Sequence, residues 1–168
     1  MLGNSYDTQV CSIARSLELV GERWSLLIIR DALFAAVTRF GDFQHNLGIA
    51  TNVLSSRLES FVASGIMARE GSADYILTSQ GRDLAVALIA LTEWGDAWAS
   101  PIEPPILYRH TACAGGAVHA VATCEACGTV RVDEIAIRIG PGMPAEYPAT
   151  RRGGTRVAES LRHERGNG

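Results

Sequence analysis

The fold is decided by residues 40–77, FGDFQHNLGIATNVLSSRLESFVASGIMAREGSADYIL. Apolar residues recur there at three- and four-residue spacing, first in 40–47 and again in 50–64, which predicts two short helices. Gly48 stands between them and marks the turn. Gly65 stands just past the second helix, where a left-handed residue commonly ends a helix. The sequence therefore predicts a pair of helices joined by a tight turn.

A hairpin is predicted directly after the helix pair. The extended runs 66–69 and 75–77 flank a turn that contains glycine, which is the usual pattern of two antiparallel strands. Thr78 then suits the cap of a further helix, running to about residue 99. A helix pair followed directly by a hairpin is the winged helix-turn-helix arrangement.

Further helices are predicted on both sides of this segment. Residues 11–20 carry one apolar face, and residues 22–36 are apolar nearly all round, which predicts the central buried helix. In the helix 78–99, an apolar stripe is formed by Leu84, Leu88, Leu91, Trp94 and Trp98. We interpret the two tryptophans as residues of the core or of a dimer interface, rather than as the lining of an effector pocket.

Length and composition limit the class of protein. The chain has 168 residues, of which 47% are hydrophobic and 20% charged, so it can bury a core. Its longest apolar runs are too short to span a bilayer, and no signal-peptide pattern is present, which predicts a cytoplasmic protein without membrane contact. Paired carboxylates, a Ser–His–Asp set and a phosphate-binding glycine loop are missing, so we expect no enzyme. The predicted fold class is mainly α (α+β).

Two clusters of proline and glycine divide the chain. They lie at 101–105 and 140–144, and such clusters end helices. We therefore predict a winged helix-turn-helix domain over 1–100, an extension over 101–140 and a loosely ordered basic tail over 141–168. The tail contains one short helical pattern, at 157–163.

Several motifs together carry a family resemblance. They are Cys11, LELVGERW (17–24), LLIIRD (26–31), TRFGDF (38–43), LGIA (47–50), NVLSSRL (52–58), YILTSQGR (75–82) and Trp94-Gly95. With these motifs in this order over residues 9–99, the chain resembles the HxlR-type branch of the MarR-like winged-helix regulators. The resemblance implies a non-enzymatic homodimer, paired through its first and last helices, that binds a double-stranded DNA operator.

Polar residues on the second helix of the pair are the candidates for reading DNA. In the helix-turn-helix arrangement this recognition helix enters the major groove, and the start of the helix contacts base edges. The outward face carries Thr51, Asn52, Ser55 and Ser56, and amide and hydroxyl groups suit base edges. Thr51 or Asn52 could also cap the helix. The alternative is an ordinary solvated helix face.

Arginines are the candidates for phosphate contacts. Arg39 begins the preceding helix, and Arg69 lies in the hairpin as a weaker candidate. Arg57 could reach a phosphate or form an ion pair within the protein. The net charge of the chain is −3, and residues 39–70 carry as many acids as arginines, so we expect DNA binding weaker than that of a basic relative. The short wing contains acidic residues, whereas family members usually have a longer and more basic one.

Cysteines and histidines after the prolines suggest a metal. His110-x2-Cys113 and Cys124-x2-Cys127 could close a tetrahedral zinc site of structural type, with His119 as the alternative to His110. Short strands are expected around it, over 117–123 and 129–132. The segment resembles a zinc-ribbon-like extension seen on many HxlR-type proteins. The alternatives are free thiols, or a redox pair formed by Cys124 and Cys127.

Cys11 opens the first predicted helix. A thiol near a helix N-terminus can be reactive, and some members of the resembled family sense oxidants or electrophiles with a cysteine in this region. The other interpretation is a small buried residue. The sequence leaves open a small-molecule or redox effector, and it leaves two other functions open: a winged-helix protein-interaction module, and a thiol-based redox protein centred on Cys124 and Cys127.

Overall fold

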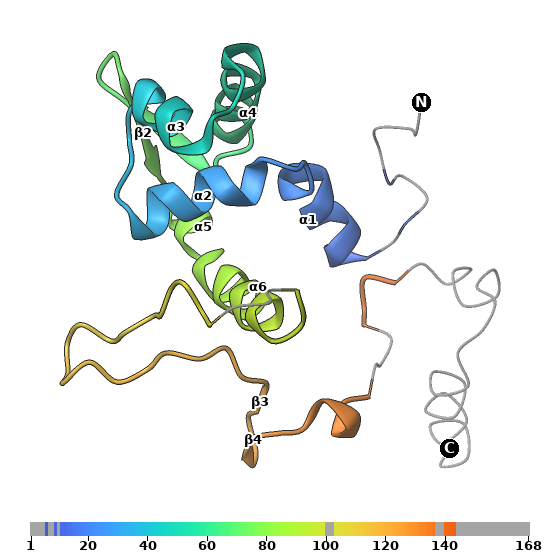
Figure 1. The fold of residues 1–168 in the computed structure, drawn as a ribbon. Helices are drawn as coiled ribbons and strands as arrows, with labels where there is room; N and C mark the ends of the chain where they lie inside the picture. Colours follow the sequence, from blue (N-terminus) through green and yellow to red (C-terminus); the bar gives the residue numbers. More distant parts are fainter. Residues whose placement is uncertain (1–5, 7–8, 10, 100–102, 137–139, 144–168) are drawn as a thin grey trace. The chain divides into compact units, whose positions relative to one another are not determined.

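The computed structural model describes Tyr6, Gln9 and residues 11–99, 103–136 and 140–143 (Figure 1). These residues form two compact units, one made of Tyr6 with 11–99 and 103–120, and one made of Gln9 with the described residues from Val121 onward. Within the described part of the chain, no helix is long and apolar enough to cross a membrane. The predicted helical stretch at 157–163 lies outside the described residues.

The first unit contains the winged helix-turn-helix. Its elements are α1 (Ser12–Val20), α2 (Ser25–Phe34), α3 (Phe40–Leu47), α4 (Thr51–Ala63), β1 (Met67–Glu70), β2 (Asp74–Leu77), α5 (Ser79–Arg82) and α6 (Ala85–Trp98). This order confirms the predicted fold class, which combines helices with small antiparallel sheets.

The core of this unit is built around α2. Ile28 and Ile29 of α2 are completely buried, together with Phe43 of α3 and Leu54 and Leu58 of α4. α2 contacts α3, β2 and α6, so apolar side chains are needed on several of its faces (Figure 1). Burial of these aliphatic and aromatic side chains, at roughly 1.5–3 kcal/mol each, is the main stabilising contribution.

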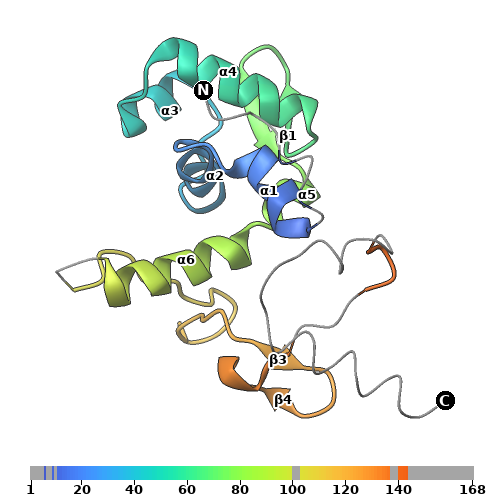
Figure 2. The ribbon, with the colours of Figure 1, turned by 90° about the vertical axis from the view of Figure 1, so that its right-hand side faces the viewer.

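Each helix of the pair is followed by a glycine with positive φ. Gly48 ends α3 in the left-handed region, with φ 60°, and its N–H donates to Gln44 O at 2.9 Å. Gly65 follows α4 with φ 79°, as the sequence predicts. Because a side chain is strained in this region, both turns depend on glycine. Figure 2 shows α3 and α4 side by side above α2.

The wing is a short hairpin joined to the residues before α3. β1 and β2 pair antiparallel, with Met67 opposite Leu77 and Glu70 opposite Asp74. The Tyr75 N–H donates to Thr38 O at 2.8 Å, and the backbones of Arg39 and Asp74 form an isolated antiparallel β-bridge. The segment before α3 therefore acts as a third, very short strand, and it ties the wing to the helix pair.

The predicted helix 78–99 is interrupted. Thr78 caps α5 as expected, with its hydroxyl accepting the Gly81 N–H at 3.3 Å. At Leu84 the N–H bonds to Gly81 O, three residues back, so the chain makes a tighter turn there before α6 begins. The helical periodicity does not reveal this break, because the apolar stripe continues through it.

The interpretation of the two tryptophans as core residues of the chain is wrong. Trp94 is 62% exposed and Trp98 is 79% exposed, and neither lines a described cavity. The buried side of α6 is formed by Leu88 and Ile89 instead. An apolar stripe alone does not tell which of its members face the same chain.

The residues after α6 hold fewer strands than predicted. In the first unit, Arg109 and Ala117 form a single antiparallel bridge. In the second unit, β3 (Thr123–Cys124) pairs with β4 (Gly128–Thr129), and a 3-10 helix follows at Val132–Glu134. Most of 117–122 is not a strand, and neither is 130–132. No described residue of 103–136 is buried, and a segment without a core forms only short local pairings.

Candidate nucleic-acid interface

α4 presents a polar face that begins at its first turn. Thr51, Asn52 and Ser56 are exposed, while Leu54 and Leu58 on the opposite face are completely buried. Asn52 and Ser56 make no side-chain hydrogen bond within the described residues. Their donors and acceptors are therefore available to a partner without breaking an internal contact.

The other two polar candidates on α4 are already engaged. The Thr51 hydroxyl accepts a hydrogen bond from Gln44 Nε2 at 2.8 Å, which links α4 to α3. The Ser55 hydroxyl donates to Glu59 Oε1 at 3.2 Å. Either group would have to exchange an internal bond for a contact with DNA.

The prediction that Thr51 or Asn52 caps α4 is wrong. The N-cap is Ala50, which offers no side-chain acceptor, and the first turn of α4 carries no acidic residue. Thr51 and Asn52 are the first two residues of the helix itself, and neither side chain accepts one of its first N–H groups. The free N–H groups and the helix dipole make this end of α4 electropositive, which suits a phosphate nearby.

Arg39 lies at the N-cap of α3, as expected, but it has an acidic neighbour. Its Nε is 3.7 Å from Asp74 Oδ1, and the same carboxylate oxygen accepts the Thr38 hydroxyl at 2.7 Å. The Arg39 side chain is 71% exposed, so the guanidinium still reaches solvent. Sequence reasoning missed this pair, because only the register of the hairpin places Asp74 beside Arg39.

The two remaining arginine candidates differ in their surroundings. Arg57 is half-buried, and no ion pair to it is present among the described residues, so the expected alternative of an internal pair is not seen there. Arg69 is exposed and lies over the ring of Tyr75, 4.8 Å from its centroid. This stacking holds the guanidinium against the wing surface.

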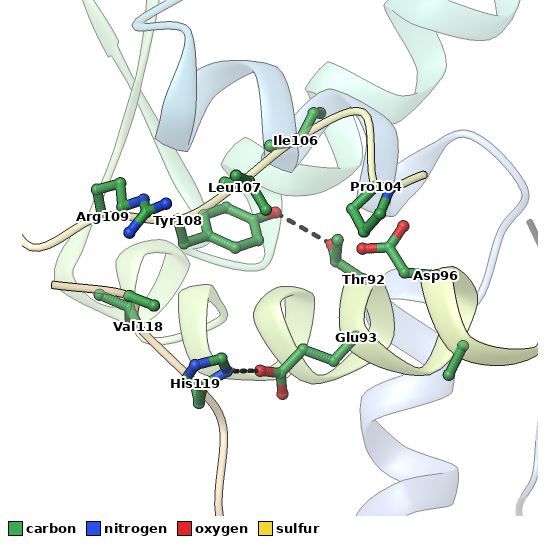
Figure 3. Close-up of a pocket in the computed structure, with 12 residues that line it drawn as sticks. Thr92, Glu93, Asp96, Pro104, Ile106, Leu107, Tyr108, Arg109, Val118 and His119 are labelled. Atoms are coloured by element: carbon green, nitrogen blue, oxygen red, sulfur yellow. Dashed lines mark hydrogen bonds and ion pairs between the residues drawn. The ribbon is translucent and has the colours of Figure 1, made fainter. Parts of the chain in front are cut away.

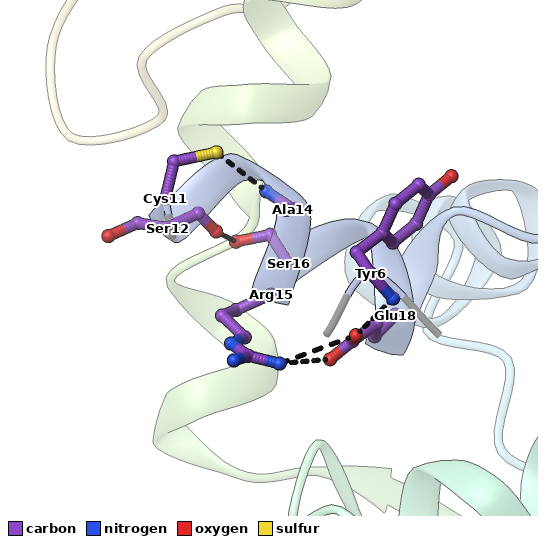
Figure 4. A network of polar contacts seen from close by, with 7 residues as sticks. All are labelled: Tyr6, Cys11, Ser12, Ala14, Arg15, Ser16 and Glu18. Atoms are coloured by element: carbon purple, nitrogen blue, oxygen red, sulfur yellow. Dashed lines mark hydrogen bonds and ion pairs between the residues drawn. The ribbon is translucent and has the colours of Figure 1, made fainter. Parts of the chain in front are cut away.

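Cys11 is the N-cap of α1, and its thiol is exposed. Its sulfur accepts the Ala14 N–H at 3.4 Å, as Figure 4 shows, beside an ion pair of Arg15 with Glu18 at 3.3 Å. The interpretation of Cys11 as a small buried residue is therefore wrong, and the thiol is accessible to a reagent.

The predicted metal ligands divide between the two units. In the first unit, the Cys113 thiol lies 3.7 Å from His110 O, and the His110 N–H donates to Gly116 O at 2.9 Å. His119 Nδ1 is 2.6 Å from Glu93 Oε1, and this contact is the main reason that the pKa of Glu93 is lowered. One of the two nitrogens of the His119 ring is therefore already paired.

In the second unit, Cys124 and Cys127 flank the turn between β3 and β4. The Cys124 sulfur accepts the Ala126 N–H at 3.4 Å, and Gly128 adopts φ 86°. Hydrogen bonds from the backbone of Ala126 and Cys127 lower the pKa of Cys124. In the described part of the chain, no three such ligand residues form a ready-made metal cluster.

The comparisons with known proteins agree on one class. A model of the HxlR-like helix-turn-helix family matches residues 19–103. The chain is 41% identical over 147 residues to proteins of Mycobacterium tuberculosis and Mycobacterium bovis, covering 83% of this chain and 92% of each relative. Both relatives are named uncharacterized HTH-type transcriptional regulators.

Solved structures extend the likeness to the fold. PA1607, a candidate transcription factor, matches with a TM-score of 0.60 at 34% identity, covering 88% of this chain and 97% of its own. PA1374 of Pseudomonas aeruginosa, described in the same way, matches with a TM-score of 0.57 at 34% identity, covering 81% of this chain and 97% of its own.

Proposed function

Because the chain belongs to the HxlR-like helix-turn-helix family, whose relatives here are named transcriptional regulators, we propose that it is a cytoplasmic, sequence-specific DNA-binding regulator. It acts as a homodimer, and each protomer places α4 in the major groove of one half-site. Its proposed activity is DNA binding, without a catalysed reaction.

The observation that carries this proposal is the exposed, uncommitted pair Asn52 and Ser56 at the start of α4. An asparagine amide can bond adenine through two hydrogen bonds, and a serine hydroxyl suits several base edges. The start of a recognition helix is the part that meets base edges in this arrangement. Arg39 and Arg57 would then hold the backbone phosphates.

Exposed apolar side chains on α1 and α6 support the homodimer. Ile13 on α1 is 73% exposed, and α6 exposes Val86, Leu91, Trp94 and Trp98 in the same way. Aromatic and aliphatic groups at this density favour burial against a second apolar surface. A second copy of the chain brings the two α4 helices to successive turns of one DNA face, about 34 Å apart or a multiple of it.

The experiment that tests the proposal is a selection from fragmented genomic DNA with the purified protein, followed by fluorescence anisotropy at two salt concentrations. We expect a recovered palindromic site that is bound in preference to scrambled DNA, with binding that weakens as salt rises. If the selection recovers no preferred sequence even at low salt, the proposal of sequence-specific DNA binding is wrong. The winged helix is then better interpreted as a protein-interaction module.

Replacing Asp74 with asparagine should strengthen DNA binding. The amide keeps an oxygen for the Thr38 hydroxyl, but the charge that faces Arg39 is removed. If Arg39 then pairs with phosphate in both protomers, affinity at low salt rises by about threefold to tenfold, and the salt slope steepens by about 2. Asp83→Asn, which changes an exposed acid outside the helix pair, is the control. Equal shifts in both variants would contradict a specific role for Asp74.

We further propose a structural zinc ion held by Cys124, Cys127, Cys113 and His110. The hairpin of the second unit fits this group, since a backbone N–H already points at the Cys124 sulfur and Gly128 makes the turn that such a cysteine pair needs. We assign His110 rather than His119 because His110-x2-Cys113 repeats the spacing of Cys124-x2-Cys127. The metal would supply cross-linking in a segment with almost no core.

Cys127→Ser is expected to abolish bound zinc, measured as metal per chain by mass spectrometry that also quantifies iron. His110→Ala should lower zinc occupancy, while His119→Ala should leave it unchanged. Cys11→Ser is the matched control, since it alters a thiol outside the proposed ligand set. Full occupancy in Cys127→Ser, or an equal loss in both histidine variants, would contradict this ligand set.

A further inference from the structure

The largest described cavity lies beside the C-terminal half of α6, within the first unit. It has a volume of about 420 Å³ and is lined by α6 together with residues from 104–109 and 117–119 (Figure 3). This volume is in the range of small-molecule sites. Most of the lining is apolar, contributed by Ala97, Pro104, Ile106, Leu107, Ala117 and Val118.

The walls of the cavity are fixed by contacts on two sides. The Tyr108 hydroxyl lies 3.1 Å from Thr92 Oγ1, and its ring packs on Phe34 with centroids 4.8 Å apart. Glu93 holds the other side through His119 Nδ1 at 2.6 Å and the Ala120 N–H at 3.2 Å. A ligand would therefore enter a largely preformed space, and little conformational entropy of the cavity walls would be lost on binding.

The charge of the cavity is uneven. Glu93 is occupied by His119, and Arg109 donates to Gly115 O at 3.2 Å. Asp96 has no hydrogen bond or ion pair within the described residues, and Figure 3 shows its carboxylate directed toward the segment at Pro104, away from Arg109. Asp96 also stands in the last turn of α6, where no basic residue offsets the negative end of the helix dipole.

We propose that this cavity binds a small hydrophobic cation, an amine carried on an aromatic or alicyclic body. The apolar lining takes the body, and the ammonium group lies against Asp96 and the C-terminal end of α6. The Tyr108 and Thr92 hydroxyls mark the polar boundary between these two regions. This site does not depend on the proposed DNA binding, and its test does not measure DNA.

The test compares three ligands of nearly equal shape: 1-naphthylmethylamine, 1-naphthalenemethanol and 1-naphthoic acid, titrated calorimetrically into the full chain at pH 7.5. We expect the amine to bind about tenfold tighter than the alcohol, because a hydrogen bond to a charged group is worth more than a neutral one. The acid should bind least. Equal affinities for all three, or no saturable binding of the amine, would overturn the proposal.

Substitutions at Asp96 test whether its carboxylate binds the ammonium group of the ligand. Asp96→Asn should lower amine affinity about tenfold and leave the alcohol unchanged, and Asp96→Arg should reverse the preference toward the acid. Asp83→Asn removes an exposed acid outside the cavity and should change none of the three. If Asp96→Asn binds the amine as tightly as the parent, or if the preference persists in Asp96→Arg, the assignment of this cavity is wrong.

Discussion

Replacing Asn52 with alanine is expected to weaken operator binding by about 30-fold or more while leaving the free energy of unfolding unchanged. A good base contact contributes about 1–3 kcal/mol, and a homodimer loses it in both half-sites, so at least about 2 kcal/mol is lost. Stability should not fall, because the Asn52 side chain is exposed and makes no hydrogen bond within the described residues. Few positions on a recognition helix separate the two effects so cleanly.

The measurement is anisotropy with the selected operator, paired with urea denaturation of the same preparations. Ser56→Ala should behave like Asn52→Ala with a smaller loss, whereas Ser16→Ala removes an exposed hydroxyl on α1 and should leave DNA binding intact. An Asn52→Ala protein that binds its operator with parental affinity would refute the role of α4 in contacting base edges. If Asn52→Ala lowers the affinity for scrambled DNA by the same factor as the affinity for the operator, Asn52 contacts a phosphate instead.

The helix pair was predictable from sequence because its signals are local. The three- and four-residue apolar spacing sets the buried faces of α3 and α4, and Gly65 provides the positive φ that ends α4. The break before α6 was not predictable in the same way. At the α5 end of this segment Gly81 packs closely on the backbone of Ile66, and no helical pattern in 78–99 contains that contact.

The sequence predicts which face of α4 is the candidate site, but not which hydroxyl or amide groups on that face are free to bind DNA. Periodicity places Thr51, Asn52, Ser55 and Ser56 outward. Whether a hydroxyl is available depends on a neighbour, such as Gln44 for Thr51, whose reach is settled only by the angle between two helices. The α6 cavity was beyond the sequence altogether, since three separate segments of the chain build it.

Gly81→Ala is expected to destabilise the protein by about 3 kcal/mol, at the upper end of the cost of overpacking. A Cβ at this position would meet Ile66 O at 2.3 Å and Leu77 Cδ2 at 2.7 Å. Ile66 O cannot move away freely, because it accepts the Thr78 N–H at 3.1 Å. The clash must therefore separate α5 from the base of the wing.

Gly95→Ala is the matched control for this prediction. Gly95 lies in the interior of α6, and a Cβ there would meet nothing within 4 Å, so the change should stabilise the helix by about 1 kcal/mol. Two identical substitutions on neighbouring helices should thus shift the urea midpoint in opposite directions. If Gly81→Ala unfolds at the parental midpoint, α5 does not pack on the Ile66 carbonyl, and the link between the wing and α6 is looser than these contacts require.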